Sequence, residues 1–469
     1  MLQTIESINN VVNNFIWGVP AMICIIGVGL YLSLRTGFVQ IRKFPYALKT
    51  TLGRIFKKKE ASDGSMTPFQ AVCTALAGTV GTGNIAGVAG AIAIGGPGAV
   101  FWMWVSALLG MCTKFTEVTL AVHFRERNRH GDYVGGPMYY IKNGLGKNWR
   151  FLAVLYSAFG VLTVFGTGNA TQVNTITTAI DTALINFNVI SESSTGRLNL
   201  ILGIVITLLV GMVLLGGIKR IGSVSEKLVP FMALFYIALA LGVVILNIGR
   251  VPAVFHDIVY GAFNPSAVTG GVVGTMIVSM QKGVARGIFS NEAGLGSAPI
   301  AAAAAQTKEP VRQGLVSMTG TFIDTIVICT MTGLSIVLTG AWQVEGLEGV
   351  QVTTYAFQHG LPIPGQISAF VLMICLVFFA FTTILGWDYY SERCLEYLTN
   401  GHKKTILTYR WLYILAVFIG PYMTVSAVWT IADIFNGLMA IPNMIALFAL
   451  SGVIVKETKA FFAAEKHKM

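Results

Sequence analysis

The chain has 469 residues, of which 54% are hydrophobic and 11% are charged, with a mean hydropathy of +0.69 and a net charge of +11. Side chains of this composition cannot cover a water-exposed surface, so a soluble protein is excluded and an integral membrane protein is predicted. The basic residues gather in loops between apolar stretches, so the positive charge indicates membrane topology and no nucleic-acid partner is expected.

Eleven apolar stretches are long enough to cross a bilayer as helices, because about 20 apolar residues span its core. They cover residues 12–34, 66–90, 98–123, 151–185, 198–216, 224–248, 269–305, 314–340, 366–398, 405–423 and 425–455. Strands of a membrane barrel would instead alternate over about ten residues. The predicted fold class is therefore an all-α integral membrane protein.

Lysine and arginine in the loops predict the orientation of the chain. Segment 35–60 holds eight of them and segment 125–150 holds six, and one side of the membrane collects 27 of the 32 in total. The head of the chain has neither a basic region nor a small-residue cleavage motif, so the first stretch is interpreted as a retained helix. Eleven crossings then place the N-terminus outside and the C-terminus in the cytoplasm, in a plasma or inner membrane.

The second stretch contains the segment from Thr79 to Gly90, TVGTGNIAGVAG, which is rich in glycine. Each glycine costs a helix interior about 1 kcal/mol, and unwound backbone inside a membrane survives only where it lines a protein cavity. The segment therefore predicts a broken helix. Free backbone amides of Thr82, Gly83 and Asn84 would form a site for a carboxylate. Close packing of helices through the same glycines is the alternative.

Polar residues also mark the fourth stretch. Phe165, Asn169 and Gln172 have the spacing i, i+4 and i+7, which places them on one face of a regular helix. Two amides on one face of a membrane helix indicate a polar cavity, because polar groups that face lipid are costly. Hydrogen bonding between helices is an equally good interpretation.

The seventh stretch is 37 residues long, from Thr269 to Ala305, too long for one straight crossing and rich in glycine. Ser290 and Asn291 are typical N-caps for a second half-helix. Breaks in spans two and seven become spans one and six of a ten-helix core once the first span is set aside, as in a five-plus-five inverted repeat. We therefore expect one transmembrane domain over residues 1–469, with an accessory helix at 12–34 and repeats at 66–248 and 269–455.

The segment from Gly95 to Gly110, GGPGAVFWMWVSALLG, resembles the signature of the alanine or glycine:cation symporter family, also called the sodium:alanine symporter family. GTGNIAGVA and FSNEAGLGSAP are similar to that family's broken-helix motifs. The resemblance implies membership of the amino acid-polyamine-organocation superfamily and the leucine-transporter fold. It also implies uptake of small neutral amino acids coupled to sodium or protons. Trp102 and Trp104 of the signature are expected at the interface and in helix packing.

The resemblance also implies roles for single residues. Phe289 and Trp387 look like walls of the substrate pocket, although a packed core explains Trp387 nearly as well. The candidate substrate-binding residues are Thr82, Gly83, Asn84, Phe165, Asn169, Gln172, Gly287, Phe289, Ser290 and Trp387. Crowding by Phe165, Phe289 and Trp387 would leave room for a small side chain only.

The resemblance further implies a sodium site in which Thr382 and Thr383 act together with the backbone carbonyls of Ala77 and Val80. A hard cation prefers oxygen ligands, and the C-terminal end of a half-helix carries partial negative charge. The alternative is that both threonine hydroxyls hydrogen-bond to their own helix.

Charged residues inside the spans have plainer explanations. Lys114 and Glu117 have helical i, i+3 spacing and are expected to neutralise each other. Lys282 and Arg286 flank the second break and are expected to form an ion pair with Glu292. The candidate proton or gate carboxylates are Asp324, Asp388 and Asp433.

The function predicted from these features is a secondary symporter that imports alanine or glycine with a cation, most simply sodium, by alternating access. Another neutral amino acid, such as glutamine or serine, and proton coupling remain alternatives. A channel would need rings of charge or carbonyls. An enzyme would need a nucleophile and base, or a metal cluster, and neither is evident. No cofactor is expected, and the partners are the amino acid, sodium and lipid.

Overall fold

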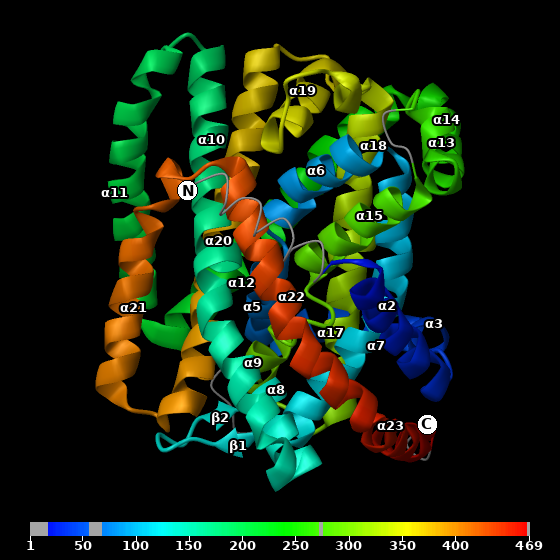
Figure 1. Ribbon diagram of the computed structural model, residues 1–469, viewed down its shortest axis with the longest axis vertical. Coiled ribbons are helices and arrows are strands. Elements are labelled where there is room, and N and C mark those ends of the chain that lie inside the picture. The colour runs from blue at the N-terminus through cyan, green and yellow to red at the C-terminus, as the bar shows by residue number, and fades with distance from the viewer. Residues whose placement is uncertain (1–16, 56–67, 272–274, 467–469) are drawn as a thin grey trace.

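The computed structural model describes residues 17–55, 68–271 and 275–466, and these are almost entirely helical (Figure 1). The starts of the predicted spans at 12–16 and 66–67, and residues 272–274 of the seventh, lie outside the described residues. A small antiparallel ribbon pairs Glu126 with Val134 and Arg127 with Tyr133. This ribbon and the last helix, α23, lie at the same end of the bundle, and α19 lies at the other end (Figure 1).

The elements of the first half are numbered in chain order, with short 3₁₀ and π segments marked η. They are α2 Val19–Arg35, α3 Val39–Arg42, α4 Phe44–Ile55, α5 Pro68–Thr79, η1 Thr82–Asn84, α6 Ala86–Gly95, α7 Gly98–His123, β1 Glu126–Arg127, β2 Tyr133–Val134, α8 Pro137–Tyr140, η2 Ile141–Leu145, η3 Lys147–Trp149, α9 Arg150–Thr163, η4 Val164–Ala170, α10 Thr171–Asn186, η5 Glu192–Ser194, α11 Thr195–Leu214 and α12 Gly217–Leu246.

The second half continues the same numbering. Its elements are η6 Ile248–Arg250, α13 Val251–Phe263, α14 Pro265–Val268, α15 Met276–Asn291, α16 Ala298–Ala303, α17 Pro310–Thr321, η7 Phe322–Cys329, α18 Thr330–Thr339, η8 Ala341–Gln343, α19 Val350–Gly360, α20 Gly365–Thr399, α21 Lys403–Val417, η9 Gly420–Tyr422, α22 Val425–Ala449 and α23 Ser451–Lys466.

Within the described residues, seven helices are long and apolar enough to cross a membrane, and one bent pair makes an eighth. In the part of the chain that the structure describes, the predicted spans at 12–34, 269–305 and 405–423 appear as the shorter helices α2, α15 with α16, and α21. The helix α7 is central, because 83% of its most apolar 18-residue segment is buried. Only 28% of the corresponding segment is buried in α11, and the same share is buried in α12. The apolar faces of α11 and α12 therefore point outward, as lipid-facing surfaces do.

The first predicted break is present. The two halves of this span, Cys73–Thr79 and Thr82–Gly95, are bent by 55° relative to each other. The break lies where Val80 and Gly81 separate α5 from η1.

The second predicted break is also present, but the predicted helix caps are wrong. Ser290 and Asn291 are the last residues of α15, and Ser297 stands at the N-cap of α16. Between them Glu292, Gly294 and Gly296 have positive φ angles of 55°, 96° and 75°. Backbone with such angles cannot continue a right-handed helix, so the helix must end before Glu292.

Candidate functional site

The two broken helices meet in the centre of the molecule. A Cβ atom added to Gly83 would lie 3.0 Å from Cδ1 of Phe289 and 3.1 Å from Cα of Ser290. The short segment η1 that contains Gly83 also packs against α10, α20 and η7. A side chain at this position would therefore press on the end of α15, because the backbone of the first break approaches it closely.

Asp324 joins the two breaks through its buried carboxylate. Its Oδ1 atom accepts a hydrogen bond of 2.7 Å from Nδ2 of Asn84 in the first break. Its Oδ2 atom accepts one of 2.8 Å from the hydroxyl of Ser290 in the second break and one of 2.7 Å from Thr325. The sequence predicts Asp324 only as a proton or gate carboxylate. A single aspartate in an apolar span was the available signal, but two of its three partners, Asn84 and Ser290, are distant in sequence.

The backbone amides at the first break are less free than the glycine pattern predicts. The Thr82 amide donates to Oε1 of Gln172 at 3.4 Å, and the Asn84 amide donates to the carbonyl of Gly81 at 3.2 Å. The side chain of Asn84 turns back to accept from the Gly81 amide at 2.8 Å. Of the three predicted amides, only that of Gly83 donates to no other described residue.

The prediction that Phe165, Asn169 and Gln172 share one face holds for Phe165 and Asn169, which both face α21, but not for Gln172, because residues 164–170 form the π segment η4. Its wider turns rotate the following residues relative to a regular helix. The Phe165 ring packs against Tyr409 and Tyr413 of α21, and Asn169 donates to the carbonyl of Tyr413 at 3.0 Å. Only Gln172 reaches the first break.

The three predicted aromatic walls do not come together. Phe289 packs against Trp429 with ring centroids 4.7 Å apart, whereas Phe165 faces α21. Trp387 is 1% exposed and packs so closely on η4 that a Cβ atom at Gly168 would lie 2.3 Å from its own Cβ. Its indole lies next to Glu292 of the second break.

Gly287 faces a different neighbour from the rest of the second break. A Cβ atom added there would lie 3.5 Å from Cα of Met103 and 3.4 Å from Oγ of Ser106, both in α7. Gly287 therefore serves the packing of α15 on α7 and does not face the first break.

The proposed sodium ligands are brought together in part. Oγ1 of Thr383 lies 3.0 Å from the carbonyl oxygen of Ala77, and it also donates to its own helix at Phe379. Oγ1 of Thr382 bonds to the carbonyls of Phe378 and Phe379 and faces the sulfur of Met232. Val80 is buried at the end of α5.

Glu117 holds the unwound backbone of the second break, a role that the sequence did not reveal. Its Oε1 atom accepts hydrogen bonds of 3.0 Å from the amides of Gly294 and Gly296, and one of 2.6 Å from Nδ2 of Asn443. Asn443 also donates to the carbonyl of Gly294 at 2.8 Å. A glutamate in an apolar helix was a visible signal, but its partners follow only from the fold.

Lys114 is buried near several carboxylates and forms no ion pair with Glu117 within the described residues. It is 2% exposed, and its Nζ atom has no hydrogen-bond partner among the described residues. Its ammonium group interacts electrostatically with the carboxylates of Glu117, Glu292 and Asp324. Lys114 and Asn291 also border a cavity of about 20 Å³, which has room for a single water.

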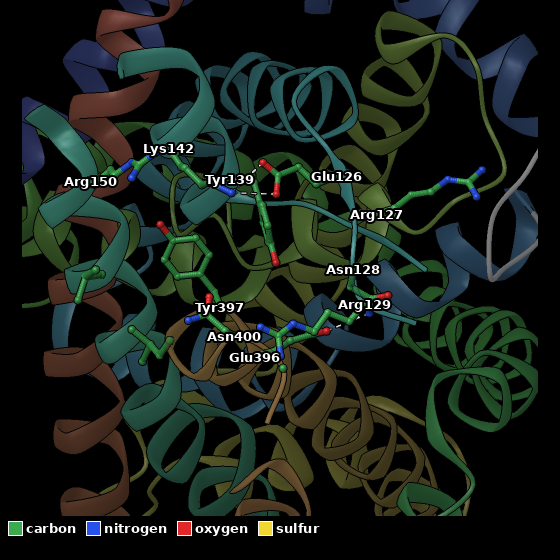
Figure 2. Close-up of a pocket in the computed structure, with 13 residues that line it drawn as sticks. Glu126, Arg127, Asn128, Arg129, Tyr139, Lys142, Arg150, Glu396, Tyr397 and Asn400 are labelled. Carbon is green, nitrogen blue, oxygen red and sulfur yellow. Dashed lines mark hydrogen bonds and ion pairs between the residues drawn. The ribbon is translucent and has the colours of Figure 1, made fainter. Parts of the chain in front are cut away.

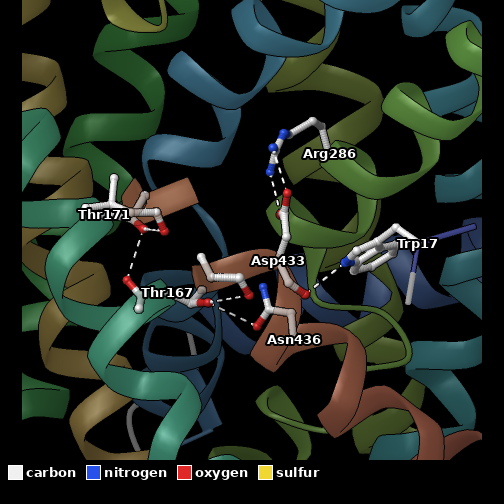
Figure 3. A network of polar contacts seen from close by, with 9 residues as sticks. Trp17, Thr167, Thr171, Arg286, Asp433 and Asn436 are labelled. Atoms are coloured by element: carbon white, nitrogen blue, oxygen red, sulfur yellow. Dashed lines mark hydrogen bonds and ion pairs between the residues drawn. The ribbon is translucent and has the colours of Figure 1, made fainter. Parts of the chain in front are cut away.

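The predicted ion pair of Arg286 with Glu292 is wrong, because Arg286 reaches a different helix. Its guanidinium makes two bonds, of 2.6 and 2.9 Å, to the carboxylate of Asp433 in α22 (Figure 3). Trp17 donates to the backbone carbonyl of Asp433 at 2.8 Å (Figure 3). The guanidinium also lies 4.5 Å from the centre of the Trp429 ring. Glu292 instead accepts from the hydroxyl of Ser297 at 2.6 Å.

The tryptophans of the GGPGAVFWMWVSALLG segment serve helix packing. The indole of Trp102 donates to the carbonyl of Ala262 at 3.1 Å, and that of Trp104 donates to the hydroxyl of Thr330 at 2.8 Å. Neither reaches the two breaks. The segment therefore fastens α13 and α18 to α7.

Comparison with known proteins matches the family model described as the sodium:alanine symporter family over residues 2–469. The sodium/alanine symporter AgcS of Methanococcus maripaludis is 46% identical over 98% of this chain and 98% of its own length. The probable sodium/glutamine symporter GlnT of Bacillus subtilis is 37% identical over 99% of this chain and 92% of its own. The crystal structure of MhsT in complex with L-phenylalanine matches with a TM-score of 0.53 at 14% identity, covering 86% of this chain and 99% of that one. This likeness shows the leucine-transporter fold.

Proposed function

Because this chain belongs to the sodium:alanine symporter family, we propose that it imports a small neutral amino acid together with sodium by alternating access. The family and its named relatives are carriers, so the chain is a membrane transporter and not an enzyme. Alanine or glycine is the proposed substrate. Glutamine is the second candidate, because the similar protein GlnT is named for it.

The close approach of Gly83 to Phe289 and Ser290 is the observation that carries the proposal. Transporters of this fold bind their cargo at the midplane, where helix breaks expose backbone groups, as the general account of the leucine transporter describes. We place the substrate carboxylate at the Gly83 amide, with Thr82, Asn84 and Gln172 around it. Phe289, Ser290 and Trp387 would border the side chain. The proposed site does not include Phe165 and Asn169, because their side chains face α21. It does not include Gly287 either, because this glycine packs against α7.

The proposed sodium site lies at the end of α5. The hydroxyl oxygen of Thr383 and the carbonyl oxygen of Ala77 are 3.0 Å apart. A hard cation prefers oxygen ligands of this kind. The carbonyl of Val80 would complete the end of the half-helix, where the helix dipole adds negative charge. Thr382 has the weaker claim, since its hydroxyl is turned toward Met232.

We further propose eleven membrane spans in one domain, with α2 as the accessory helix and repeats at 66–248 and 269–455. The N-terminus would lie outside and the C-terminus in the cytoplasm of a cell or inner membrane. The basic loops at 35–60 and 125–150 support this orientation. Fusion of a cytoplasm-active reporter enzyme after the last residue tests it, and an inactive fusion in a correctly inserted protein would contradict it.

Uptake by the purified full-length protein in proteoliposomes tests the function. Labelled alanine should accumulate only with an inward sodium gradient, and unlabelled glycine should compete. Accumulation driven equally by a proton gradient without sodium would contradict sodium coupling. Competition by glutamine at lower concentration than by alanine would favour the second substrate. A conductance without accumulation would contradict the symporter altogether.

A further inference from the structure

A second pocket, of about 490 Å³, lies at the end of the bundle that carries the β1–β2 ribbon. It is far in sequence from the two breaks and takes no part in the proposed transport site. It is lined by Glu126, Arg127, Asn128, Arg129, Tyr139, Lys142, Arg150, Val154, Glu396, Tyr397, Leu398, Asn400 and Gly401. Figure 2 shows Arg150 and Lys142 on one side of the Tyr397 ring and Arg129 on the other.

The acidic residues of this pocket are already neutralised. Glu126 accepts hydrogen bonds of 2.9 Å on both oxygens from Lys142, and Asn143 donates to it as well. Glu396 pairs with Arg393 at 2.5 Å and accepts from Asn128 at 2.9 Å. The carboxylates therefore add little net negative charge to the pocket.

Two cations remain without an acidic partner in the described part of the chain. No hydrogen bond or ion pair to a described residue is found for the side chains of Arg129 and Arg150, both of which are exposed. A guanidinium offers a planar fork of donors that matches a phosphate better than an ammonium does. The pocket is thus suited to an anion with several oxygen atoms.

One wall of the pocket continues into an apolar surface. Val154 of α9 lines the pocket and is 48% exposed, and the same helix exposes Phe151 at 56% and Leu155 at 42%. Trp149 stacks on Phe151 with centroids 6.2 Å apart, at the start of this helix. Aromatic side chains at the end of a membrane helix are typical of the level of the lipid headgroups. The anion in the pocket would therefore have acyl chains beside it.

We propose that this pocket binds the phosphodiester headgroup of an anionic phospholipid, with Arg129 and Arg150 as its ligands and the exposed face of α9 against the acyl chains. Basic pockets between helices at the inner surface of a membrane are known to take such headgroups. A free phosphate would use the same two guanidinium groups but would leave the apolar wall at Phe151 and Val154 without a role.

The experiment uses the full-length protein, stripped of lipid in an uncharged detergent, and binding of a phosphatidylglycerol with one fluorescent acyl chain. Phosphatidylcholine with the same label is the neutral probe, and inorganic phosphate is the competitor. The variant is Arg129→Gln with Arg150→Gln. The matched control is Arg197→Gln with Arg250→Gln, which removes two exposed arginines, one in the first turn of α11 and one at the end of η6. All four positions are exposed, so each protein is expected to fold, and a single symmetric gel-filtration peak checks it.

Phosphatidylglycerol should bind the parent and the control roughly tenfold or more tightly than phosphatidylcholine, because each basic residue near a lipid surface contributes to attraction of anionic headgroups. The Arg129 and Arg150 double variant should lose most of that preference. Equal binding of the two lipids by the parent, or an equal loss in the control, would overturn the proposal. Displacement of the lipid by millimolar inorganic phosphate would instead assign the pocket to a free anion. Binding is measured without transport, so this result is independent of the proposed function.

Discussion

Oγ1 of Thr383 lies 3.0 Å from the carbonyl oxygen of Ala77, which connects the middle of α20 to the end of α5 at the first break. A Cβ atom added to Gly81, at the first break, would lie 2.4 Å from the same hydroxyl. The backbone of the break therefore packs directly against the Thr383 side chain. Both oxygens are hard ligands, and a sodium ion bound between them would replace the hydrogen bond. This geometry separates Thr383 from its neighbour Thr382.

Thr383→Ala should raise the sodium concentration for half-maximal alanine uptake by at least about tenfold, because a ligand oxygen of the proposed site is lost. At saturating sodium the affinity for alanine should largely recover, since linked ligands strengthen each other reciprocally. Initial uptake rates in proteoliposomes over a matrix of sodium and alanine concentrations measure both effects.

Thr382→Ala is the matched control, because its hydroxyl bonds to its own helix and faces Met232. It should change the sodium requirement by less than about threefold. Thr383→Ser should restore the parent behaviour, since it keeps the hydroxyl. An equal loss of uptake at every sodium concentration in Thr383→Ala would contradict a ligand role.

Gly83→Ala should lower uptake about tenfold or more. The new Cβ would lie 3.0 to 3.1 Å from Phe289 and from the backbone of Ser290, so the two breaks would have to move apart. Gly90→Ala, in α6 of the same half-span, is the control, because its Cβ would meet nothing within 4 Å. Purified variants are compared by alanine uptake and by their thermal unfolding midpoint Tm. Normal transport by Gly83→Ala would show that the substrate does not depend on this close approach.

The two helix breaks were predictable from the sequence because their cause is local. Glycine clusters inside apolar stretches are rarely compatible with a regular helix, and both clusters coincide with unwound backbone. The resemblance to the symporter family was also visible in short motifs and is confirmed by the match over residues 2–469. The contact of Thr383 with Ala77 was expected from that resemblance.

The rest of the candidate site depends on packing between distant segments, which no local pattern reveals. Phe165 and Asn169 share a face toward α21, but with the π segment at 164–170 Gln172 faces the first break instead. Arg286 bonds to Asp433, which is 147 residues away, and not to the nearby Glu292. Buried charges in a membrane protein must find partners, but the sequence does not say which ones.

Asp324→Asn should weaken alanine uptake about tenfold at saturating sodium. Both carboxylate oxygens accept hydrogen bonds, from Asn84 on one side and from Ser290 and Thr325 on the other. An amide replaces one acceptor with a donor, so one buried donor loses its partner at a cost of about 1–3 kcal/mol. Asp257→Asn, at a side chain that is 45% exposed, is the control and should transport normally. Residual uptake that no longer responds to sodium would indicate instead that Asp324 takes part in ion coupling.

The last prediction concerns Glu117, which holds the second break, and Lys114, which lies near it. Glu117→Gln keeps a carbonyl oxygen for the amides of Gly294 and Gly296 but removes the negative charge close to Lys114. The lysine is buried and has no hydrogen-bond partner among the described residues, so the nearby carboxylates are the groups that can compensate its charge.

Glu117→Gln should therefore lower the Tm, and Lys114→Met alone should lower it as well, because each variant removes one of the opposite charges that compensate each other in this buried cluster. Leaving one member of a buried charge pair unpaired costs about 3–5 kcal/mol. The double variant Lys114→Met with Glu117→Gln removes both charges and should unfold at a higher temperature than Glu117→Gln alone. Such non-additivity is the signature of two residues in one network. Strictly additive losses in Tm would show that Lys114 is compensated by Glu292 and Asp324 and acts independently of Glu117.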